Sequence, residues 1–293
     1  MNKVIVITGP TAVGKTKLSI ELAKRYNGEI INADAVQVYK GLDIGSAKVT
    51  EEEKEDIPHH LFDIKEVDEE YTIYHYQKDC RKLIKEVQGR GKTPILVGGT
   101  GLYIKAALYD YKLTEEKETN TYDNLTDEEL YNKLLEADKD IVIDKNNRRR
   151  LIRALNYYKE NNKSINTNTT NKLLYDAIFI GLTTDRRILY DKINTRVDIM
   201  IKDGLLNEVK AFYDKNVRTK PLLNAIGYRE IYSYFDGNIS LEEAIDKIKQ
   251  NSRHYAKRQY TFFNHQLPVV WFETDYSNFN NTVEKVINYI ENN

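Results

Sequence analysis

The chain has little cysteine, no long apolar run and almost no net charge. Cys80 is the only cysteine among 293 residues, so neither an internal disulfide nor a zinc site built from several cysteines is possible. No apolar stretch approaches the roughly 20 residues of a membrane-spanning helix. With 44 basic and 45 acidic residues the formal net charge is −1, which gives no general attraction to nucleic acid. These features predict a globular protein of the cytoplasm that makes no contact with a membrane.

The first 26 residues read as a strand, a glycine-rich loop and a helix. Val4–Thr8 is an apolar run, Gly9–Thr16 has the pattern G-x-x-x-x-G-K-T, and Lys17–Tyr26 is amphipathic. In such a P-loop the backbone N–H groups and the helix N-terminus bind phosphate oxygens. The lysine reaches the phosphates and the threonine hydroxyl binds Mg²⁺. Because this short apolar stretch leads directly into the loop, we expect no signal peptide.

Further apolar runs predict a parallel sheet. Besides Val4–Thr8, the expected strands are Ile30–Ala33, Pro94–Val97, Ala177–Leu182 and Pro268–Phe272. Helical patterns lie between them and fill the C-terminal third, over Ile188–Tyr213, Ser240–Phe263 and Val283–Ile290. Strands that alternate with helices favour an α/β fold, a P-loop NTPase-like parallel sheet flanked by helices.

The acidic segment 113–145 differs from the rest and predicts a small helical insertion domain. Thr126 and Glu129 form a capping box that begins a short helix ending near Leu135. Residues 1–112 and 146–293 would then form the catalytic core. Asn161–Lys172 is rich in Asn and Thr without apolar periodicity, so we expect a surface loop there.

Two strand ends carry side chains or glycines suited to a ligand site. Asp34 follows the second expected strand, at the sheet edge where ligands of α/β proteins bind, and could ligate a metal, accept a proton or cap a turn. The strand Pro94–Val97 ends in Gly98-Gly99-Thr100-Gly101, where a P-loop kinase would carry an aspartate. These glycines allow a close backbone approach to a ligand, or simply a tight turn.

Histidines and cations offer weaker signals. His59 and His60 are adjacent and face different ways, which favours a hydrogen-bonded pair over a metal site. Arg148–Arg153 places a cationic stripe on a helix, which is either an RNA contact or a solvated face. Ser252–Phe263 mixes cations with aromatic residues, a composition that suits RNA but also an amphipathic core helix.

Together these motifs resemble the isopentenyl-tRNA transferase family, the bacterial tRNA dimethylallyltransferases. The matching stretches run in family order along nearly the whole chain: Gly9–Thr16, Asp34–Lys48, Ile57–Ile64, Pro94–Leu108, Arg149–Leu155, Ile193–Ile201, Ala225–Ile231 and Ser252–Phe263. The resemblance implies transfer of a dimethylallyl group from dimethylallyl diphosphate to N6 of the adenosine 3′ of the anticodon. Ala35 departs from the usual serine, Phe262 from the usual tryptophan, and the 113–145 insertion is shorter than usual.

The resemblance also implies residue roles. Asp34 would be the general base, Thr16 would hold Mg²⁺ as the cofactor, and Arg196 would neutralise the leaving diphosphate. The diphosphate would lie on Gly9, Thr11, Ala12, Val13, Gly14, Lys15 and Thr16. The anticodon stem-loop of the tRNA would contact Asp34, Ala35, Val36, Gln37, Thr100, Arg149, Arg150, Arg153, Asn224, Arg253, Lys257, Arg258 and Gln259. We expect the protein to act as a monomer.

Three other functions compete with this interpretation. A P-loop small-molecule kinase would use ATP, but the strand-end aspartate after Pro94–Val97 is lacking. A prenyltransferase acting on a free adenine nucleotide would not need the basic segments near Arg150 and Lys257. An RNA-binding protein with a decayed site would not retain Lys15 and Asp34.

Overall fold

The computed structural model describes residues 3–113, 122–165 and 171–293, and its chain forms two compact units. The first unit comprises Met1–Leu108 and Tyr175–Asn293, and the second comprises Tyr109–Leu174. The elements of the first unit are β1 (Val4–Thr8), α1 (Lys15–Tyr26), β2 (Gly28–Asn32), α2 (Glu51–Lys54), β3 (His59–His60), α3 (Ile73–Gly89), β4 (Thr93–Val97), α4 (Gly101–Leu108), β5 (Ala177–Thr183), α7 (Arg186–Lys202), α8 (Leu205–Tyr213), α9 (Lys220–Asn224), α10 (Tyr228–Phe235), α11 (Leu241–Gln266), β6 (Val270–Glu273) and α12 (Phe279–Glu291).

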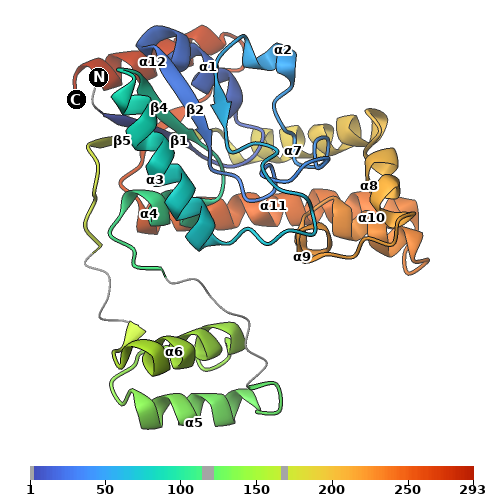
Figure 1. The fold of residues 1–293 in the computed structure, drawn as a ribbon. Helices are drawn as coiled ribbons and strands as arrows, with labels where there is room; N and C mark the ends of the chain where they lie inside the picture. Colours follow the sequence, from blue (N-terminus) through green and yellow to red (C-terminus); the bar gives the residue numbers. More distant parts are fainter. Residues whose placement is uncertain (1–2, 114–121, 166–170) are drawn as a thin grey trace. The chain divides into compact units, whose positions relative to one another are not determined.

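All pairings in the sheet are parallel, and the strand order is β3-β2-β4-β1-β5-β6 (Figure 1). Strand β1 is central, paired with β4 on one side and β5 on the other, and all five of its residues are buried. The segments that follow β1, β2 and β4 therefore lie at one edge of the sheet, where ligands of α/β proteins bind. The predicted parallel α/β fold is confirmed.

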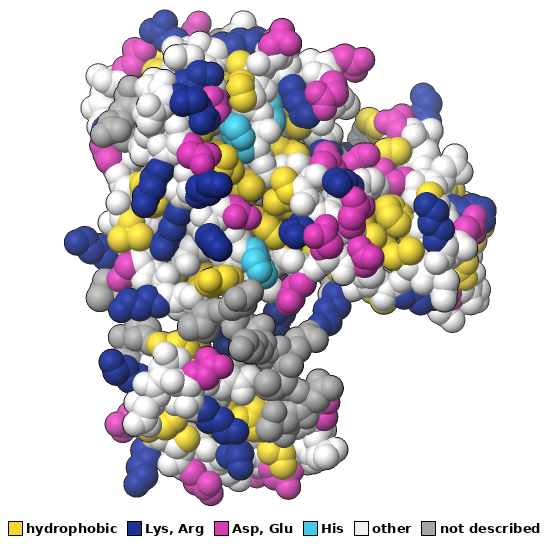
Figure 2. All heavy atoms as spheres, viewed as in Figure 1, with side chains coloured by type: hydrophobic (Ala, Val, Ile, Leu, Met, Phe, Trp, Pro, Cys, Tyr) yellow, Lys and Arg dark blue, Asp and Glu magenta, His cyan; other side chains and the backbone are white. Residues whose placement is uncertain are grey.

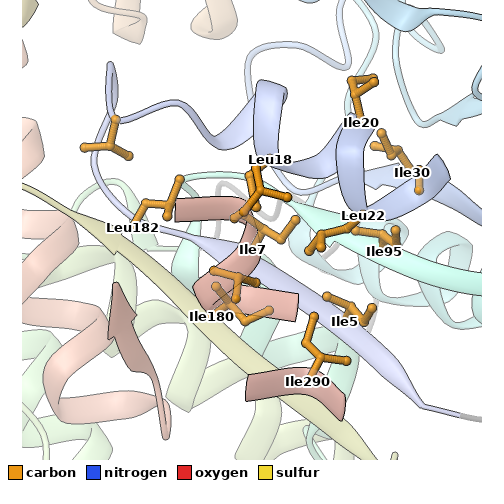
Figure 3. Packing of buried hydrophobic residues seen from close by; sticks show 14 of the residues in the cluster. Ile5, Ile7, Leu18, Ile20, Leu22, Ile30, Ile95, Ile180, Leu182 and Ile290 are labelled. Carbon is orange, nitrogen blue, oxygen red and sulfur yellow. The ribbon is translucent and has the colours of Figure 1, made fainter. Parts of the chain in front are cut away.

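Helices α1 and α12 cover one face of the sheet, and α3 and α4 lie on the other (Figure 1). Alternate residues of β1, Ile5 and Ile7, pack with Leu18 and Leu22 of α1 in the cluster shown in Figure 3. The far end of this cluster is closed by Ile290 of α12. Each fully buried side chain of this size contributes about 1.5–3 kcal/mol, so this face holds the P-loop rigidly to the sheet.

The second unit is helical. Helices α5 (Asp127–Ala137) and α6 (Arg148–Asn161) pack on each other around Leu130, Leu134 and Leu151, and Thr126 and Glu129 form the expected capping box. We expected the insertion to end at Lys145, but the unit extends to Leu174. The reason is that the apolar face of α6 packs against α5, so α6 belongs with the insertion.

Several elements differ from the sequence-based expectations. The helical run expected over Ile188–Tyr213 is two helices, because Gly204 takes a φ of +105° and begins α8. Strand β3 and the helices α4, α9 and α10 were not predicted, since each is short or bounded by tertiary contacts. Of the loop expected over Asn161–Lys172, Asn161 ends α6, and residues 166–170 lie outside the described part of the chain.

Candidate active site

A cavity of about 820 Å³ opens at the carboxyl edge of the sheet. One wall, here called the strand-end wall, consists of the segments after β1, β2 and β4. The other wall, here called the helix wall, comes from α7, α9, α10 and α11 and the segments next to them. Fourteen of the residues predicted for the site line the cavity: Thr11, Ala12, Gly14, Lys15, Thr16, Asp34, Ala35, Val36, Gln37, Thr100, Arg196, Asn224, Arg258 and Gln259.

The P-loop has the backbone conformation that a phosphate cradle needs. Gly9, Ala12 and Gly14 all have positive φ, and a Cβ on Gly9 would meet Leu182 O at 2.5 Å. Gly14 caps the N-terminus of α1, whose first residue is Lys15. The predicted contact at Val13 can involve only its backbone, because its side chain is fully buried in the core.

The amine of Lys15 lies close to the loop and to two other charged groups. Its Nζ donates to Gly9 O at 3.0 Å and to Pro10 O at 2.6 Å. Burial and, less strongly, the charge of Arg196 lower the pKa of Lys15 to about 7, while Asp34 opposes the shift. Arg196 of α7 donates from Nη1 to Thr11 Oγ1 at 2.9 Å. Two cations therefore converge on the P-loop, where they can stabilise anionic oxygens.

Asp34 follows β2 and faces the same cavity. Its Oδ1 accepts from the backbone N–H groups of Val36 at 2.9 Å and Gln37 at 3.4 Å. Burial raises the pKa of the Asp34 carboxyl, while these two N–H groups and Lys15 partly lower it. A carboxylate that is partly desolvated and fixed in this way can act as a proton acceptor.

The glycines after β4 let the backbone pass close to Ala33, which precedes Asp34, and to Gln259 of α11. A Cβ on Gly98 would meet Ala33 O at 2.2 Å, and one on Gly99 would meet Gln259 Nε2 at 2.1 Å. Thr100 Oγ1 accepts from the N–H of Ala35 at 3.1 Å, so it fixes the residue next to Asp34.

Gln259 and Tyr255 of α11 belong to the helix wall, and Gln259 contacts the glycine segment after β4. Gln259 Nε2 donates to Gly99 O at 3.0 Å, and its Oε1 is buried without a hydrogen-bond partner among the described residues. Burial raises the pKa of the Tyr255 hydroxyl to about 12, so it stays protonated as a donor. The resemblance placed Tyr255 within the tRNA-lining range Ser252–Gln259 but did not single it out, because within an aromatic-rich helix nothing distinguishes it from core residues.

The loop Asp43–Ala47, which lines the cavity, is held by a glutamate that sequence reasoning missed. Glu208 of α8 accepts from three consecutive backbone N–H groups, those of Asp43 at 3.1 Å, Ile44 at 2.7 Å and Gly45 at 3.1 Å. The Tyr228 hydroxyl donates to the same carboxylate at 2.5 Å. Gln37 Nε2 in turn donates a hydrogen bond to Ser46 O of this loop at 2.9 Å. Nothing in the spacing of the chain connects Glu208 with residues 43–45.

Five of the predicted tRNA contacts do not line the cavity. Arg149, Arg150 and Arg153 lie on α6 of the second unit. Arg253 of α11 donates to Asn194 Oδ1 at 2.6 Å, and Lys257 is exposed. Their contacts with tRNA stay predictions. On the face drawn in Figure 2, acidic and basic side chains are interspersed, in keeping with the net charge of −1.

The adjacent histidines are hydrogen-bonded, as predicted, and to different partners. His59 Nδ1 lies 2.7 Å from Ile57 O, and His60 Nε2 lies 2.7 Å from Oε2 of the buried Glu29. Glu29 also pairs with Arg90 and Lys92. Hydrogen bonds from these cations hold its pKa at about 2 against the opposing effect of burial. His60 thus belongs to a structural ion-pair cluster at β2.

A divalent cation would find few protein ligands here. Within the described ranges, no group of three or more His, Cys, Asp or Glu side chains could hold a metal. Thr16 is exposed in the cavity, and its hydroxyl makes no hydrogen bond with another described residue. This suits Mg²⁺, which takes one or two protein ligands and completes its shell with phosphate oxygens and water. The described residues also contain no helix that is both long and apolar enough to span a membrane.

Comparisons with known proteins identify the family of this chain. The model of the IPP transferase family matches residues 37–266. A tRNA dimethylallyltransferase of Anoxybacillus flavithermus is 50% identical over 99% of this chain and 96% of its own length, and one of Geobacillus kaustophilus is 48% identical over 98% and 96%.

Solved structures give the same result. The tRNA isopentenylpyrophosphate transferase of Staphylococcus epidermidis superposes with a TM-score of 0.77 at 40% identity, covering 100% of this chain and 99% of that one. A eukaryotic dimethylallyltransferase acting on tRNA superposes with a TM-score of 0.89 at 31% identity, covering 100% and 79%. Because the family model spans most of the chain and the relatives cover nearly all of it, this chain belongs to the IPP transferase family.

Proposed function

We propose that this chain transfers a dimethylallyl group from dimethylallyl diphosphate to N6 of the adenosine 3′ of the anticodon in tRNA. One observation carries the proposal: Asp34 lies in the same cavity as the P-loop, within electrostatic reach of Lys15. A site that holds a phosphate cradle and a proton acceptor side by side suits a reaction that releases diphosphate and a proton together. The relatives named above are tRNA dimethylallyltransferases and a tRNA isopentenylpyrophosphate transferase.

The chemistry divides between the two kinds of group. The exocyclic amine is a weak nucleophile, so cleavage of the allylic C1–O bond is the demanding step. Its electron pair leaves on the diphosphate, whose added charge Lys15 and Arg196 stabilise. The N6 lone pair forms the C1–N bond, and Asp34 accepts the N6 proton.

Mg²⁺ is part of this proposal. The Thr16 hydroxyl would hold it, and when bound the ion would supply further positive charge beside the diphosphate oxygens. The allylic carbon would also react with water, so the site must exclude solvent during transfer. The adenosine must leave its stack to enter the cavity.

The kinase alternative lacks support at β4. The segment after this strand packs Gly98 against Ala33 and presents Thr100 to Ala35, so it holds no carboxylate for a nucleotide-bound metal. The free-nucleotide alternative is tested directly by offering AMP in place of tRNA.

The test is transfer of labelled dimethylallyl to an unmodified tRNA transcript, with nucleoside mass spectrometry of the product. We expect transfer by the native chain and at least a ~100-fold lower rate for Asp34→Asn, in which an amide oxygen still accepts from Val36. Asp198→Asn is the control, because Asp198 is exposed and pairs with Lys249 outside the cavity. Absence of transfer by the native chain would refute the function, and full activity of Asp34→Asn would refute the role of Asp34.

A further inference from the structure

The segment Gly227–Glu230 forms part of the helix wall and has no role in the chemistry above. Gly227 has a φ of +98° and caps α10. Tyr228 points into the protein, where it is fully buried and donates to Glu208. Arg229 lines the cavity, and Glu230 is buried behind it. Gly227 and Arg229 therefore line the cavity, while Tyr228 and Glu230 are buried.

Glu230 is anchored from three sides. Only 4% of its side chain is exposed. Its Oε2 accepts from the N–H of Gly227 at 2.8 Å, and its Oε1 accepts from Asn251 Nδ2 at 2.7 Å and Arg229 Nε at 2.6 Å. A buried carboxylate is tolerated only when it is paired and hydrogen-bonded, and here both oxygens have partners. The Glu230 carboxylate is thus a fixed point to which the Arg229 side chain is attached.

This attachment uses one N–H group of Arg229 and leaves the others available. A guanidinium carries five N–H donors in a rigid fork, and Nε provides only one of them. The two terminal nitrogens make no hydrogen bond with another described residue, and 39% of the side chain is exposed. A cation held at Nε, with its terminal nitrogens unbonded, loses little conformational entropy when it binds an anion, and a guanidinium fork matches phosphate oxygens.

The position of Arg229 separates it from the diphosphate site. Lys15 and Arg196 converge on the P-loop, whereas Arg229 belongs to α10 and lines the helix wall of the cavity. The electrostatic neighbours that shift the pKa of Lys15 are Arg196 and Asp34. An anion bound by Arg229 would therefore be a second one, besides the diphosphate. A polynucleotide supplies such an anion, because it carries a phosphate at every nucleotide.

We propose that Arg229, positioned by Glu230, binds a backbone phosphate of the tRNA substrate. This inference rests on the proposed function, because a substrate without a phosphodiester backbone would give Arg229 nothing to bind. It assigns Arg229 to affinity for RNA and leaves the chemical step to Asp34, Lys15 and Arg196.

The test compares tRNA binding by the native chain and by Arg229→Gln across a range of salt concentrations, with an unmodified tRNA transcript as the probe. Glutamine can still donate to Glu230, so no buried carboxylate is left unpaired. We expect affinity at low salt to fall about tenfold, and the slope of log K against log salt to become shallower by about one phosphate contact. Binding of dimethylallyl diphosphate alone should not change.

Arg218→Gln is the matched control. Arg218 is bound to Asp236 and lies outside the cavity, so it should leave the salt slope unchanged. Arg229→Lys, which keeps the charge, should retain most of the slope. An unchanged slope in Arg229→Gln, or an equal change in Arg218→Gln, would overturn the proposal. So would weaker binding of dimethylallyl diphosphate, which would move Arg229 to the small substrate. If the native chain does not bind tRNA at all, the proposed function itself fails.

Discussion

The two walls of the cavity are held in place by different forces. On the strand-end wall the backbone itself is packed: Gly98 N donates to Ile7 O at 3.2 Å, and Thr100 N donates to Ala33 O at 3.0 Å. Elsewhere in the cavity, carboxylates do the positioning: Glu208 of α8 holds the loop at residues 43–45, and Glu230 of α10 holds Arg229 on the helix wall. The comparison indicates that Asp34 and Thr100 stand on backbone packed against the sheet, while the loop at residues 43–45 and Arg229 are held by side chains that a substitution can release one at a time.

The largest expected effect comes from breaking the strand-end wall at Gly98. Gly98→Ala would place a Cβ 2.2 Å from Ala33 O and 2.8 Å from Ala33 Cα, which are backbone atoms directly after β2. Because neither can move aside cheaply, we expect a loss of at least about 1–3 kcal/mol in the free energy of unfolding, measured by urea denaturation. Activity should fall as well, since the displaced segment carries Thr100.

Gly89→Ala is the control for this change. A Cβ on Gly89 of α3 meets no atom within 4 Å, and alanine favours a helix, so its stability should be unchanged or slightly raised. Equal stability of Gly98→Ala and Gly89→Ala would show that the strand-end wall is not held by backbone packing.

A smaller and more selective effect is expected at Glu208 of α8, which holds the loop at residues 43–45. In Glu208→Gln one carboxylate oxygen becomes an amide that cannot accept a hydrogen bond. At least one N–H group of the loop Asp43–Ala47, or the Tyr228 hydroxyl, then loses its acceptor. Since a hydrogen bond to a charged group is worth about 1.5–3 kcal/mol, the loop that holds Gln37 should loosen.

Steady-state kinetics check this prediction. The KM for tRNA should rise by roughly tenfold while the KM for dimethylallyl diphosphate stays near its native value. Asp214→Asn, which removes an exposed ion pair with Lys210 at the end of α8, should change neither constant. A parallel rise in both KM values for Glu208→Gln would mean that the loop at residues 43–45 supports the diphosphate site as well.

The same comparison explains what sequence could predict. The strand-end wall follows from local pattern, because a P-loop, a strand-end Asp34 and a glycine turn each occupy a few consecutive residues between periodic elements. The rest of the cavity depends on contacts between distant segments, such as Glu208 with residues 43–45, and no local spacing encodes them. Tyr228 and Arg229 lie within a family motif, yet only the structure shows that one faces inward and the other the cavity. The insertion boundary was wrong for a similar reason, since only packing shows that α6 belongs with α5.

The smallest expected effect, a proton taken up when diphosphate binds, sharpens the chemistry of the strand-end wall. Because the pKa of Lys15 lies near 7, the amine is mostly neutral at pH 8, and the negative charge of a bound diphosphate raises its pKa and restores the ammonium. Calorimetric titration with dimethylallyl diphosphate at pH 8, in buffers of different ionisation enthalpy, should therefore report uptake of about 0.9 proton.

As pH rises from 7 towards 9, the affinity for dimethylallyl diphosphate should weaken by up to about tenfold per pH unit, because less of the free protein carries a charged Lys15. Lys15→Arg keeps its charge over this range and should take up no proton, whereas uptake through Asp34 would persist in that variant. Binding at pH 8 without proton uptake by the native chain would contradict the prediction, and it would mean that the P-loop holds its lysine charged before any phosphate arrives.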